Sequence, residues 1–535
     1  MRRGGADPIG PRRGGADRIG PRRDGVDGHR ACTGRTGPHR NEADRTGPRK
    51  GGADHRTVQG QRADDTTWES SMPNVPPRPH AMQVAELDLD TLDPPSSAEP
   101  HVARGAPAHG VIALRPGPGG APVGPGEVFV LVRRRGRPVG TLTATVPDGA
   151  DPAEILAAVA RDRLAPGVAG RPAREAVTRR RAAPHPAAPP AAAAPEGAAH
   201  RAAPPRTSVV VATRERPGRL ARALDSLLAQ DHPDFEVVVV DNAPLTGATR
   251  ELIERKYGER VRYVHEPVPG LAVAHNRGVA ASDGTVLAFT DDDVVADPHW
   301  LTALTAPFAE DHRIGCVTGL ILPARLGTPA QILLESHGGF AKGFAPRTYD
   351  PARPPADEPL FPFTAGRFGS GANMAFRARV LRAAGGFDPA TGTGTAARGG
   401  DDLYAFVRIL VDGHRLRYTP DALVWHHHRE TERDLRNQAF GYGAGLTAYL
   451  TALVARRPGL LPALLARLPR GLAHARTTTA HRDGAVGVPG EHGAGGHPWP
   501  RSLSRLERRG MLAGPLGYVR ARRRVRGLPL PWEER

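Results

Sequence analysis

Cysteine is scarce in this chain of 535 residues, which contains only Cys32 and Cys316. Two cysteines so far apart exclude a disulfide framework and fit a reducing compartment. No apolar run reaches the roughly 18 residues that a membrane-spanning helix needs. No apolar segment follows the basic N-terminus, so the pattern of a secretory signal is missing. These absences predict a cytoplasmic protein, and leave open peripheral contact with the inner face of the plasma membrane.

Aromatic side chains are almost absent from the first 81 residues, where Arg2–Pro11 is nearly repeated as Arg12–Pro21. Such Gly, Arg, Pro and Asp repeats cannot bury a core. The net charge of +17 favours an acidic partner, but bases would find no aromatic platform here. We expect residues 1–109 to be a disordered, low-complexity tail without a specific nucleic-acid partner. Upstream sequence translated from a misassigned start, with Met72 or Met82 as the real one, is our hypothesis for its origin.

A small folded module is expected over residues 110–165. Val128–Val132 and Gly140–Val146 predict two strands joined by a turn. Asp151 then begins a helix that runs to about Leu164, which makes the module ββα. It shows no catalytic pattern, so we expect an accessory role. Residues 166–206 are rich in Ala and Pro, which is typical of an extended, semi-rigid linker.

Apolar strands and helices alternate from residue 207 onwards. The predicted strands are 208–213, 235–242, 261–265 and 285–290, and the predicted helices are about 217–230, 246–257 and 270–282. This alternation predicts an α/β fold whose parallel sheet is covered on both faces. No Gly-x-Gly-x-x-Gly or Gly-Lys-Ser/Thr sequence follows the first strand, which argues against a nucleotidyl- or dinucleotide-binding enzyme on a similar sheet.

Carboxylates follow two of these strands at once. Val286–Thr290 leads directly into Asp291, Asp292 and Asp293, and another strand ends at Asp241. Adjacent carboxylates are costly unless a cation or hydrogen-bond donors compensate. A hard divalent ion can be held by one or two carboxylates together with substrate phosphates. An isolated Asp triplet would suggest a solvated acidic turn, but ligands of open α/β sheets bind at this rim. The pattern therefore favours a metal–diphosphate site.

Eight short segments occur in a characteristic order. They are Val209–Arg216, Val238–Asn242, Pro269–Gly278, Phe289–Asp293, Gly369–Phe376, Gly385–Asp388, Gly400–Leu403 and Pro420–His426. Together they resemble the family 2 glycosyltransferases over about residues 207–430. The resemblance implies an α/β GT-A domain (nucleotide-diphospho-sugar transferase, Rossmann-like), here with a small N-terminal ββα module and a helical C-terminal region at 431–535. It also implies metal-dependent, inverting transfer of a sugar from a nucleoside diphosphate, most commonly UDP, to an acceptor hydroxyl.

The resemblance implies roles at the metal and diphosphate. Asp291 and Asp293 match the family's Asp-x-Asp, and Asp293 is expected to contact Mg²⁺ or Mn²⁺ directly. Asp291 or Asp292 would face the ribose or a water molecule. His426 matches a family histidine that would ligate the metal or bind phosphate, whereas the following His427 and His428 are interpreted as solvated.

Further roles follow for the nucleotide and for catalysis. Asp241 matches the acidic residue that binds the nucleoside, and Thr213 and Glu215 lie at the neighbouring strand end. Asn276 and Arg277 are expected beside the diphosphate, although His275 stands where the family more often has Arg. Asp402 matches the general base, which takes the proton of the acceptor hydroxyl. Because a predicted helix follows, a helix N-cap is the alternative interpretation of Asp402.

The C-terminal region predicts helices with apolar faces and basic ends over 439–456 and 458–470, and a strongly basic stretch at 518–526. Such helices either pack on the catalytic domain or lie on an anionic membrane. We expect a carbohydrate or lipid-linked acceptor, in cell-envelope polysaccharide, glycolipid or natural-product glycosylation. The alternative is a catalytically inactive or non-enzymatic nucleotide- or membrane-binding protein of the same fold. The intact Asp291, Asp293 and Asp402 argue against it.

Overall fold

The computed structural model describes residues 80–89, 113–164, 204–337, 339–467, 469–471, 499–530 and 532. These residues all belong to one compact unit, Asn74–Arg535. The predictions for the N-terminal repeats, for the alternative start at Met72 and for almost all of the linker lie outside the described residues. No described helix is both long enough and apolar enough to span a membrane.

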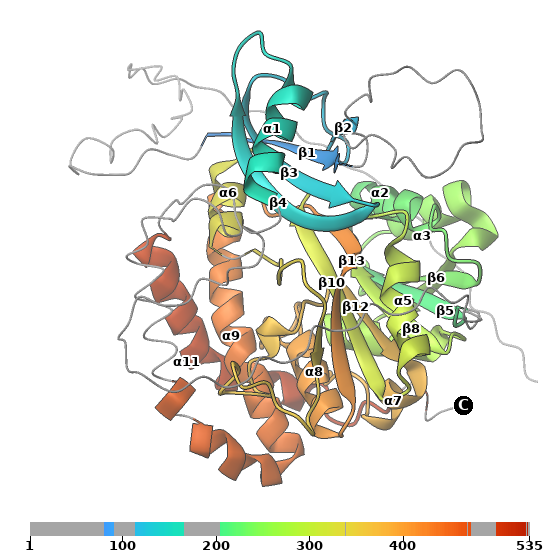
Figure 1. Ribbon diagram of the computed structural model, residues 1–535. Helices are drawn as coiled ribbons and strands as arrows, with labels where there is room; N and C mark the ends of the chain where they lie inside the picture. The colour runs from blue at the N-terminus through green and yellow to red at the C-terminus, as the bar shows by residue number, and fades with distance from the viewer. Residues whose placement is uncertain are drawn as a thin grey trace, which may run out of the picture. The chain divides into compact units, whose positions relative to one another are not determined.

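A large mixed sheet runs through the described structure (Figure 1). Its strand order is β11 (Arg347–Tyr349), β13 (Arg415–His426), β10 (Ile314–Pro323), β12 (Asn373–Arg377), β8 (Val286–Asp291), β5 (Thr207–Thr213), β6 (Phe235–Asn242) and β7 (Arg262–Glu266), with β9 (Val294–Ala296) paired to β13. Strands β8, β5, β6 and β7 are parallel, as predicted. The sheet as a whole is not parallel, because β12 runs antiparallel to both of its neighbours.

Helices cover both faces of this sheet. They are α2 (Pro217–Leu227), α3 (Ala248–Leu252) with a π-helical continuation to Tyr257, α4 (Leu271–Ala281), α5 (Trp300–Glu310), α6 (Pro329–Ser336), α7 (Ala378–Ala383) and α8 (Asp401–Val411). Along β5, Val209 and Val211 pack in one buried cluster with Leu220 and Leu224, whereas Val210 packs in another with Val279. Because successive strand residues point to opposite faces, β5 is buried on both sides.

The register of the parallel strands brings the predicted site residues to one rim. Thr213 at the end of β5 pairs with Asp241 of β6. The preceding residue, Ala212, pairs with Asp291 at the end of β8. The three strand ends therefore lie side by side, which confirms the expected common rim.

The N-terminal module has more strands than the sequence predicted. Its sheet has the order β2 (Ala113–Pro116), β1 (Gln83–Asp88), β3 (Gly126–Arg134) and β4 (Arg137–Val146), and α1 (Pro152–Leu164) packs on it. The assignment of residues 83–88 to the low-complexity tail is wrong. This hexapeptide forms a central strand only because it pairs in parallel with β3, a partner distant in sequence.

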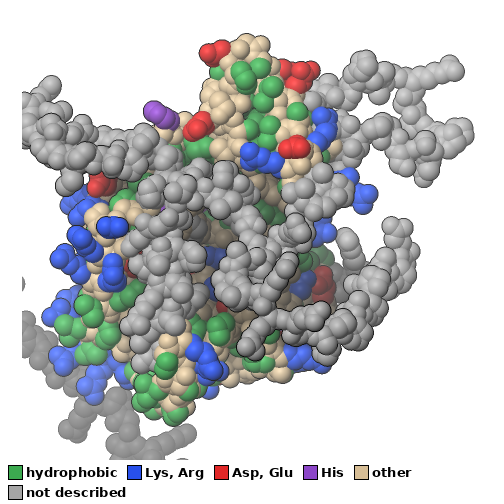
Figure 2. Space-filling model, turned by 60° about the vertical axis from the view of Figure 1, so that its left-hand side comes forward, with side chains coloured by type: hydrophobic (Ala, Val, Ile, Leu, Met, Phe, Trp, Pro, Cys, Tyr) green, Lys and Arg blue, Asp and Glu red, His purple; other side chains and the backbone are tan. Residues whose placement is uncertain are grey.

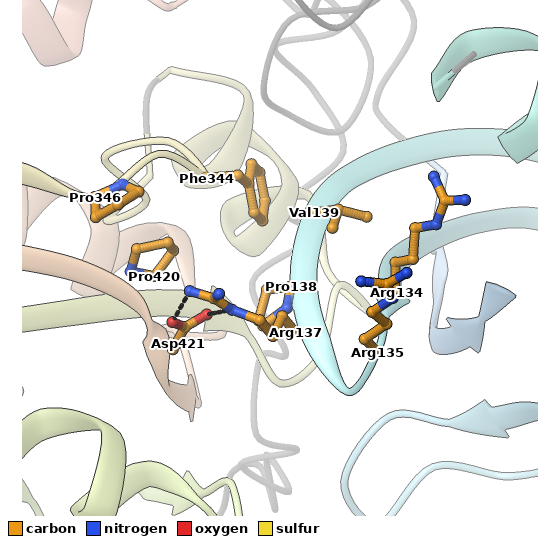
Figure 3. Close-up of a pocket in the computed structure, with 9 residues that line it drawn as sticks. All are labelled: Arg134, Arg135, Arg137, Pro138, Val139, Phe344, Pro346, Pro420 and Asp421. Carbon is orange, nitrogen blue, oxygen red and sulfur yellow. Dashed lines mark hydrogen bonds and ion pairs between the residues drawn. The ribbon is translucent and has the colours of Figure 1, made fainter. Parts of the chain in front are cut away.

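The module packs on the large sheet through a shared core and two arginines. Phe129 of β3 lies in one buried cluster with Leu322 and Trp425. The side chain of Arg133 is 12% exposed and pairs with both Glu86, at 2.7 Å, and Asp297, at 2.6 Å. The exposed Arg137 forms a two-pronged contact with Asp421 beside a groove of about 510 Å³ (Figure 3). This groove contains no carboxylate cluster, so the candidate site lies elsewhere.

Two long C-terminal helices, α9 (Glu432–Arg456) and α11 (Arg501–Arg524), lie against each other (Figure 1). Glycines allow the close approach: a Cβ at Gly510 would lie 2.1 Å from the carbonyl oxygen of Phe440. A Cβ at Gly443 would lie 1.9 Å from the carbonyl oxygen of Glu507. The helix predicted over 439–456 is confirmed and begins earlier, at Glu432, behind the capping side chain of Thr431.

Candidate functional site

The rim of the large sheet borders a cavity of about 1000 Å³. Strand ends, the loops before β12 and α8, and the helices α9 and α11 contribute to its walls. Its lining includes His275, Asp291, Lys342, Gly371, Asp401, Asp402, His426, Arg429 and Arg524. The predicted Asp-x-Asp strand end and the predicted general base therefore face one space, although more than a hundred residues separate them in sequence.

Three predicted metal ligands come together at this rim. Potential ligand atoms of Asp291, Asp293 and His426 all lie within 4.8 Å of one another. Nε2 of His426 lies 3.3 Å from Oδ1 of Asp293. Two carboxylates and one imidazole form a donor set that suits Mg²⁺ or Mn²⁺, with room for phosphate oxygens. The residues present thus fit the divalent cation that the family resemblance implies.

The carboxylates of this cluster differ in their electrostatics. Burial, together with the charges of Asp293 and Asp292, raises the pKa of Asp291 to about 6. Burial by itself would also raise the pKa of Asp293. The hydrogen bond from His426 and the charges of Arg429 and Arg216 instead hold it below its ordinary value. The negative charge of the clustered carboxylates is therefore only partly compensated by cationic side chains, as expected where a metal cation binds.

Three arginines surround Asp293, and none of them was predicted from the sequence. Arg216 lies 3.6 Å, Arg219 3.4 Å and Arg429 3.6 Å from Oδ2 of Asp293. Arg216 and Arg219 are near the start of α2, and Arg429 follows β13. The only signal for Arg216 was its place in the first family-like segment. These cations place positive charge directly beside the carboxylate cluster.

Asp292 and Thr213, both predicted to contact the nucleotide, contact each other. The hydroxyl of Thr213 donates a 2.7 Å hydrogen bond to Oδ2 of Asp292. Oδ1 of Asp292 accepts from Arg216 at 3.2 Å, and the side chain is buried. Burial raises the pKa of Asp292, whereas Arg216 and Thr213 lower it. Asp292 thus connects β8 to β5 and holds Arg216 beside the rim.

Asp241 and Glu215 have different surroundings. Asp241 is fully buried, and its Oδ2 accepts a 3.1 Å hydrogen bond from Tyr263. Its Oδ1 has no hydrogen bond of ordinary geometry within the described part of the chain. Burial raises the pKa of Asp241. Both oxygens of Glu215, in contrast, accept from Leu245 and Thr246. Asp241 therefore keeps one buried carboxylate oxygen without a hydrogen-bond partner among the described residues, and Glu215 holds the loop after β6.

The structure does not bring Asn276 and Arg277 to the cavity. The buried amide of Asn276 donates to the carbonyl oxygen of Phe387 at 2.8 Å and accepts from its N–H at 2.9 Å. Arg277 is exposed and does not line the cavity. His275 does line it, with Nδ1 3.3 Å from Oδ2 of Asp401. This outcome follows from the helical period, because only one face of α4 can point toward the rim.

Asp402 lies in the first turn of α8, whose N-cap is Gly400. Its Oδ2 accepts a 2.9 Å hydrogen bond from the N–H of Gly371, and its Oδ1 a 2.8 Å bond from the N–H of Leu403. Burial, with the charges of Asp401 and Asp291, raises the pKa of Asp402 to about 7. A carboxylate with a pKa near neutrality is suited to general base catalysis. Asp402 is not the N-cap residue of α8.

The interpretation of His428 as solvated is wrong. Its side chain is buried between Phe340, Glu335 and His426. Its Nε2 lies 3.1 Å from Oε2 of Glu335, and its Nδ1 lies 3.2 Å from Nδ1 of His426. Burial lowers the pKa of His428. His426 and His428 are two residues apart, so both side chains lie on the same side of the extended chain. The sequence did not reveal this burial, because the partner Glu335 lies on the distant helix α6.

Lys342 also lines the cavity and was not indicated by the sequence. Burial, assisted by the charge of Arg367, lowers the pKa of Lys342 to about 8. It lies in the irregular segment between α6 and β11, which has no family-like motif. The cavity thus combines a carboxylate cluster with a lysine whose pKa of about 8 is close to neutral pH.

Comparison with known proteins agrees with this geometry. Residues 208–383 match the family model described as "Glycosyl transferase family 2". A pre-mycofactocin glycosyltransferase of Mycobacterium tuberculosis is 28% identical over 252 residues, which are 46% of this chain and 47% of that protein. A validoxylamine A glucosyltransferase of Streptomyces hygroscopicus is 34% identical over 148 residues, 26% of this chain and 32% of that protein. The matched segments therefore span less than half the length of these relatives.

A solved structure also shares part of the arrangement. It is a mannosyltransferase of Pyrobaculum calidifontis in complex with GDP-Man and Mn²⁺, 20% identical, with 59% of this chain and 87% of that chain covered and a TM-score of 0.39. That score is too low to support a functional argument. The family match over residues 208–383, taken with the sheet topology, confirms the predicted family resemblance and the α/β GT-A fold class with a helical C-terminal region.

Proposed function

We propose that this chain is a metal-dependent, inverting glycosyltransferase with its catalytic GT-A domain at about residues 207–430. The observation that carries the proposal is that one cavity is lined by Asp402 and by Asp291 and His426, two members of the cluster that Asp293 completes. A cation site and a general base are the two groups needed for direct displacement at a sugar bound to a nucleoside diphosphate. The match of residues 208–383 to the family 2 model supports the same reaction class.

The chain's own residues divide the work of this reaction. Asp402, with its pKa near 7 and its two backbone hydrogen bonds, takes the proton of the acceptor hydroxyl as that oxygen attacks the anomeric carbon. Asp291, Asp293 and His426 hold Mg²⁺ or Mn²⁺. A bound divalent cation supplies Lewis-acid stabilisation of the leaving diphosphate. Arg216, Arg219 and Arg429, which surround Asp293, would contribute further positive charge to stabilise the leaving diphosphate.

The donor proposal rests on the rim between β5 and β6. Asp241 has a buried carboxylate oxygen without a hydrogen-bond partner at the place where we propose that the nucleoside lies. We propose that the donor is a nucleotide sugar, with UDP as its nucleotide. For the acceptor we propose a carbohydrate or a lipid-linked sugar of cell-envelope, glycolipid or natural-product synthesis. A cytoplasmic protein with peripheral contact at the plasma membrane fits such an acceptor. The alternative is a nucleotide-binding protein of the same fold without transferase activity.

Thermal-shift binding separates these possibilities. The full chain is mixed with UDP, GDP or dTDP and their common sugars, each with and without Mn²⁺. Binding to the folded state raises the melting temperature by mass action. We expect a Mn²⁺-dependent shift with one nucleotide, abolished in Asp293→Ala and retained in Asp283→Ala, whose carboxylate is exposed away from the cluster. Folded protein without any shift would contradict the proposal, and binding without product formation would favour the inactive alternative.

A further inference from the structure

The outward face of α11 carries an apolar stripe. Leu512 is 84%, Leu516 54% and Val519 40% exposed. Their spacing of four and three residues places them in one row along the helix. The opposite face contains Gly510 and Gly514, whose lack of a side chain lets α11 lie close against α9. This close packing keeps the leucines turned outward.

Basic side chains extend the same row at both ends. Arg505 and Arg509 precede the apolar stripe on the same face, Arg520 and Arg523 follow or flank it, and all four are exposed. Glu507 is the only acidic residue in α11, among eight arginines. Figure 2, which turns the side of the molecule that carries α9 and α11 toward the viewer, shows Lys and Arg side chains interspersed with hydrophobic ones. Such a face matches an anionic surface with an apolar interior, because the leucines insert where the arginines meet phosphate groups.

We propose that the outward face of α11, formed by Leu512, Leu516 and Val519 with its flanking arginines, docks on an anionic lipid membrane. The same helix also reaches the cavity, which Arg524 lines. Where the proposed function holds, membrane docking brings the cavity close to an acceptor that is embedded in the lipid. The docking itself requires neither donor nor metal, so it is tested apart from transferase activity.

The experiment is flotation of the full chain with vesicles of phosphatidylglycerol and phosphatidylcholine, and with phosphatidylcholine alone. We expect the wild-type protein to float with the anionic vesicles only, and less at high salt. The double variant Leu512→Glu/Leu516→Glu should lose about tenfold in vesicle partitioning, since it places charge in the inserted row. Leu245→Glu, at a position 80% exposed and outside α11, is the matched control and should float like the wild type.

Three results would overturn the membrane proposal. The first is a wild-type protein that stays in the soluble fraction at low salt. The second is a double variant that floats as well as the wild type. The third is self-association in light scattering that the double variant abolishes while no form binds vesicles, which would identify a second copy as the occupant. Circular dichroism of both variants checks that α11 remains folded.

A separate observation concerns the buried chain of groups behind His426. Glu335 lies 3.1 Å from Nε2 of His428, and Nδ1 of His428 lies 3.2 Å from Nδ1 of His426. All three side chains are buried, and the ring of Phe340 packs on both imidazoles. Gln331 donates a 3.3 Å hydrogen bond to the backbone carbonyl of His428 and so helps to hold it in place.

The donors and acceptors in this chain can be ordered in one direction. An ionised carboxylate only accepts, so Nε2 of His428 carries the hydrogen toward Glu335. Nδ1 of His428 then accepts the hydrogen bond from Nδ1–H of His426. Without a cation, Nε2 of His426 donates its hydrogen to Asp293 at 3.3 Å. With a cation bound, Nε2 would give up that hydrogen and turn its lone pair to the ion, while Nδ1 keeps its hydrogen toward His428. Outer hydrogen-bond partners of a ligating histidine commonly set its tautomer in this way.

We infer that Glu335 and His428 are positioning residues that hold His426 in the tautomer able to ligate the proposed cation. The inference rests on the proposed function, because it assumes that Asp291, Asp293 and His426 bind the metal. Glu335→Gln keeps the size of the side chain but replaces a carboxylate, which only accepts hydrogen bonds, by an amide that can also donate one, so the tautomer of His428 is no longer fixed. We expect its Mn²⁺ affinity to fall about tenfold or more, as for other losses of a ligand's hydrogen-bond partner.

Titration of the protein with Mn²⁺, followed by the electron paramagnetic resonance signal of the free ion, measures this affinity without any turnover. Glu358→Gln is the matched control, a buried glutamate paired with Arg367 and remote from His426 in the hydrogen-bond network. Wild-type protein that fails to bind Mn²⁺ contradicts the proposed metal site itself. Wild-type and Glu335→Gln proteins of equal affinity contradict only the positioning role. If Glu335→Gln does not fold, nitrogen-15 NMR of labelled wild-type histidines gives the tautomers directly, and Nε2–H on metal-free, neutral His426 contradicts the inference.

Discussion

The N–H of Gly371 donates a 2.9 Å hydrogen bond to Oδ2 of Asp402 across two segments that the sequence separates widely. Together with the N–H of Leu403 on Oδ1, it gives each carboxylate oxygen one fixed partner. The orientation of Asp402 is thus determined by the loop before β12 as well as by its own helix. A general base must be held within reach of the proton that it removes, and this pair of donors meets that requirement.

Replacement of Asp402 by Asn should abolish most turnover while the fold remains. The amide has nearly the same shape but cannot accept the acceptor's proton, so we expect kcat to fall about 10²- to 10⁴-fold. Product formation from nucleotide sugar, once the donor is known, measures the effect. Asp412→Asn, immediately after the other end of α8, is the matched control, with expected kcat near that of the wild type. Nucleotide affinity should be unchanged in both, and near-normal turnover in Asp402→Asn would remove this residue from the catalytic role.

The activity should decrease as the pH falls through about 7. The proton acceptor must be ionised, and burial with the charge of Asp401 raises the pKa of Asp402 to about 7 in the metal-free protein. A bound cation next to Asp291 would move this acidic limb to lower pH, because it offsets one of the raising charges. A profile of kcat/KM against pH at saturating Mn²⁺ tests the prediction. If kcat/KM instead falls at a pH clearly above 7, the group responsible for the fall is not Asp402.

The same group should make the folded protein less stable as the pH rises. The pKa of Asp402 is higher in the folded state than its ordinary value of 3.8, so the folded state binds its proton more tightly. Its stabilising contribution is complete below that ordinary value and is lost as the pH increases through about 7. Asp402→Asn has no such titration, so urea unfolding between about pH 5 and 9 should show the wild type losing stability relative to the variant as the pH rises through about 7. A difference in stability between the two proteins that does not change with pH would contradict the raised pKa.

Two arginines at the contact of the module with the large sheet should differ greatly in their effect on stability. The side chain of Arg133 is only 12% exposed and pairs with Glu86 and Asp297, so Arg133→Ala leaves two carboxylates without this partner. We expect it to lower the free energy of unfolding by about 3–5 kcal/mol. Arg137 is 65% exposed, and Arg137→Ala should cost about 0–1 kcal/mol. Urea unfolding measures the free energy of unfolding of both variants. A larger decrease in Arg137→Ala than in Arg133→Ala would contradict the prediction that Arg133 is the more important of the two.

Packing between α9 and α11 should be sensitive to a single methyl group. Gly510→Ala places a Cβ 2.1 Å from the carbonyl oxygen of Phe440, which forces the two helices apart. We expect α11 to become accessible to limited proteolysis, with a lower melting temperature. Gly459→Ala is the control, because nothing lies within 4 Å of a Cβ there. Unchanged protection of α11 in Gly510→Ala would show that the helices can separate slightly without cost.

Local patterns in the sequence determined the strand and helix order of the catalytic region and the residues at its rim. Continuous apolar strands can only be buried ones, and carboxylates directly after them can only lie at a strand end. The register of β5, β6 and β8 then followed from parallel pairing, so Asp241 and Asp291 were placed correctly without any coordinates. Recognition of the ordered motifs added Asp402 and His426, which no local rule connects to Asp291.

Tertiary structure alone decided how these groups are partnered. Arg429 approaches Asp293, Gly371 orients Asp402, and Glu335 supports His428 through contacts between segments that are distant in sequence. The same holds for β1, which is a strand only because β3 lies beside it. Hydrogen bonds and ion pairs act over a few ångströms in space, whereas sequence patterns report only neighbours along the chain. The sequence by itself therefore determined which chemistry the rim contains, and the fold decided which side chains orient it.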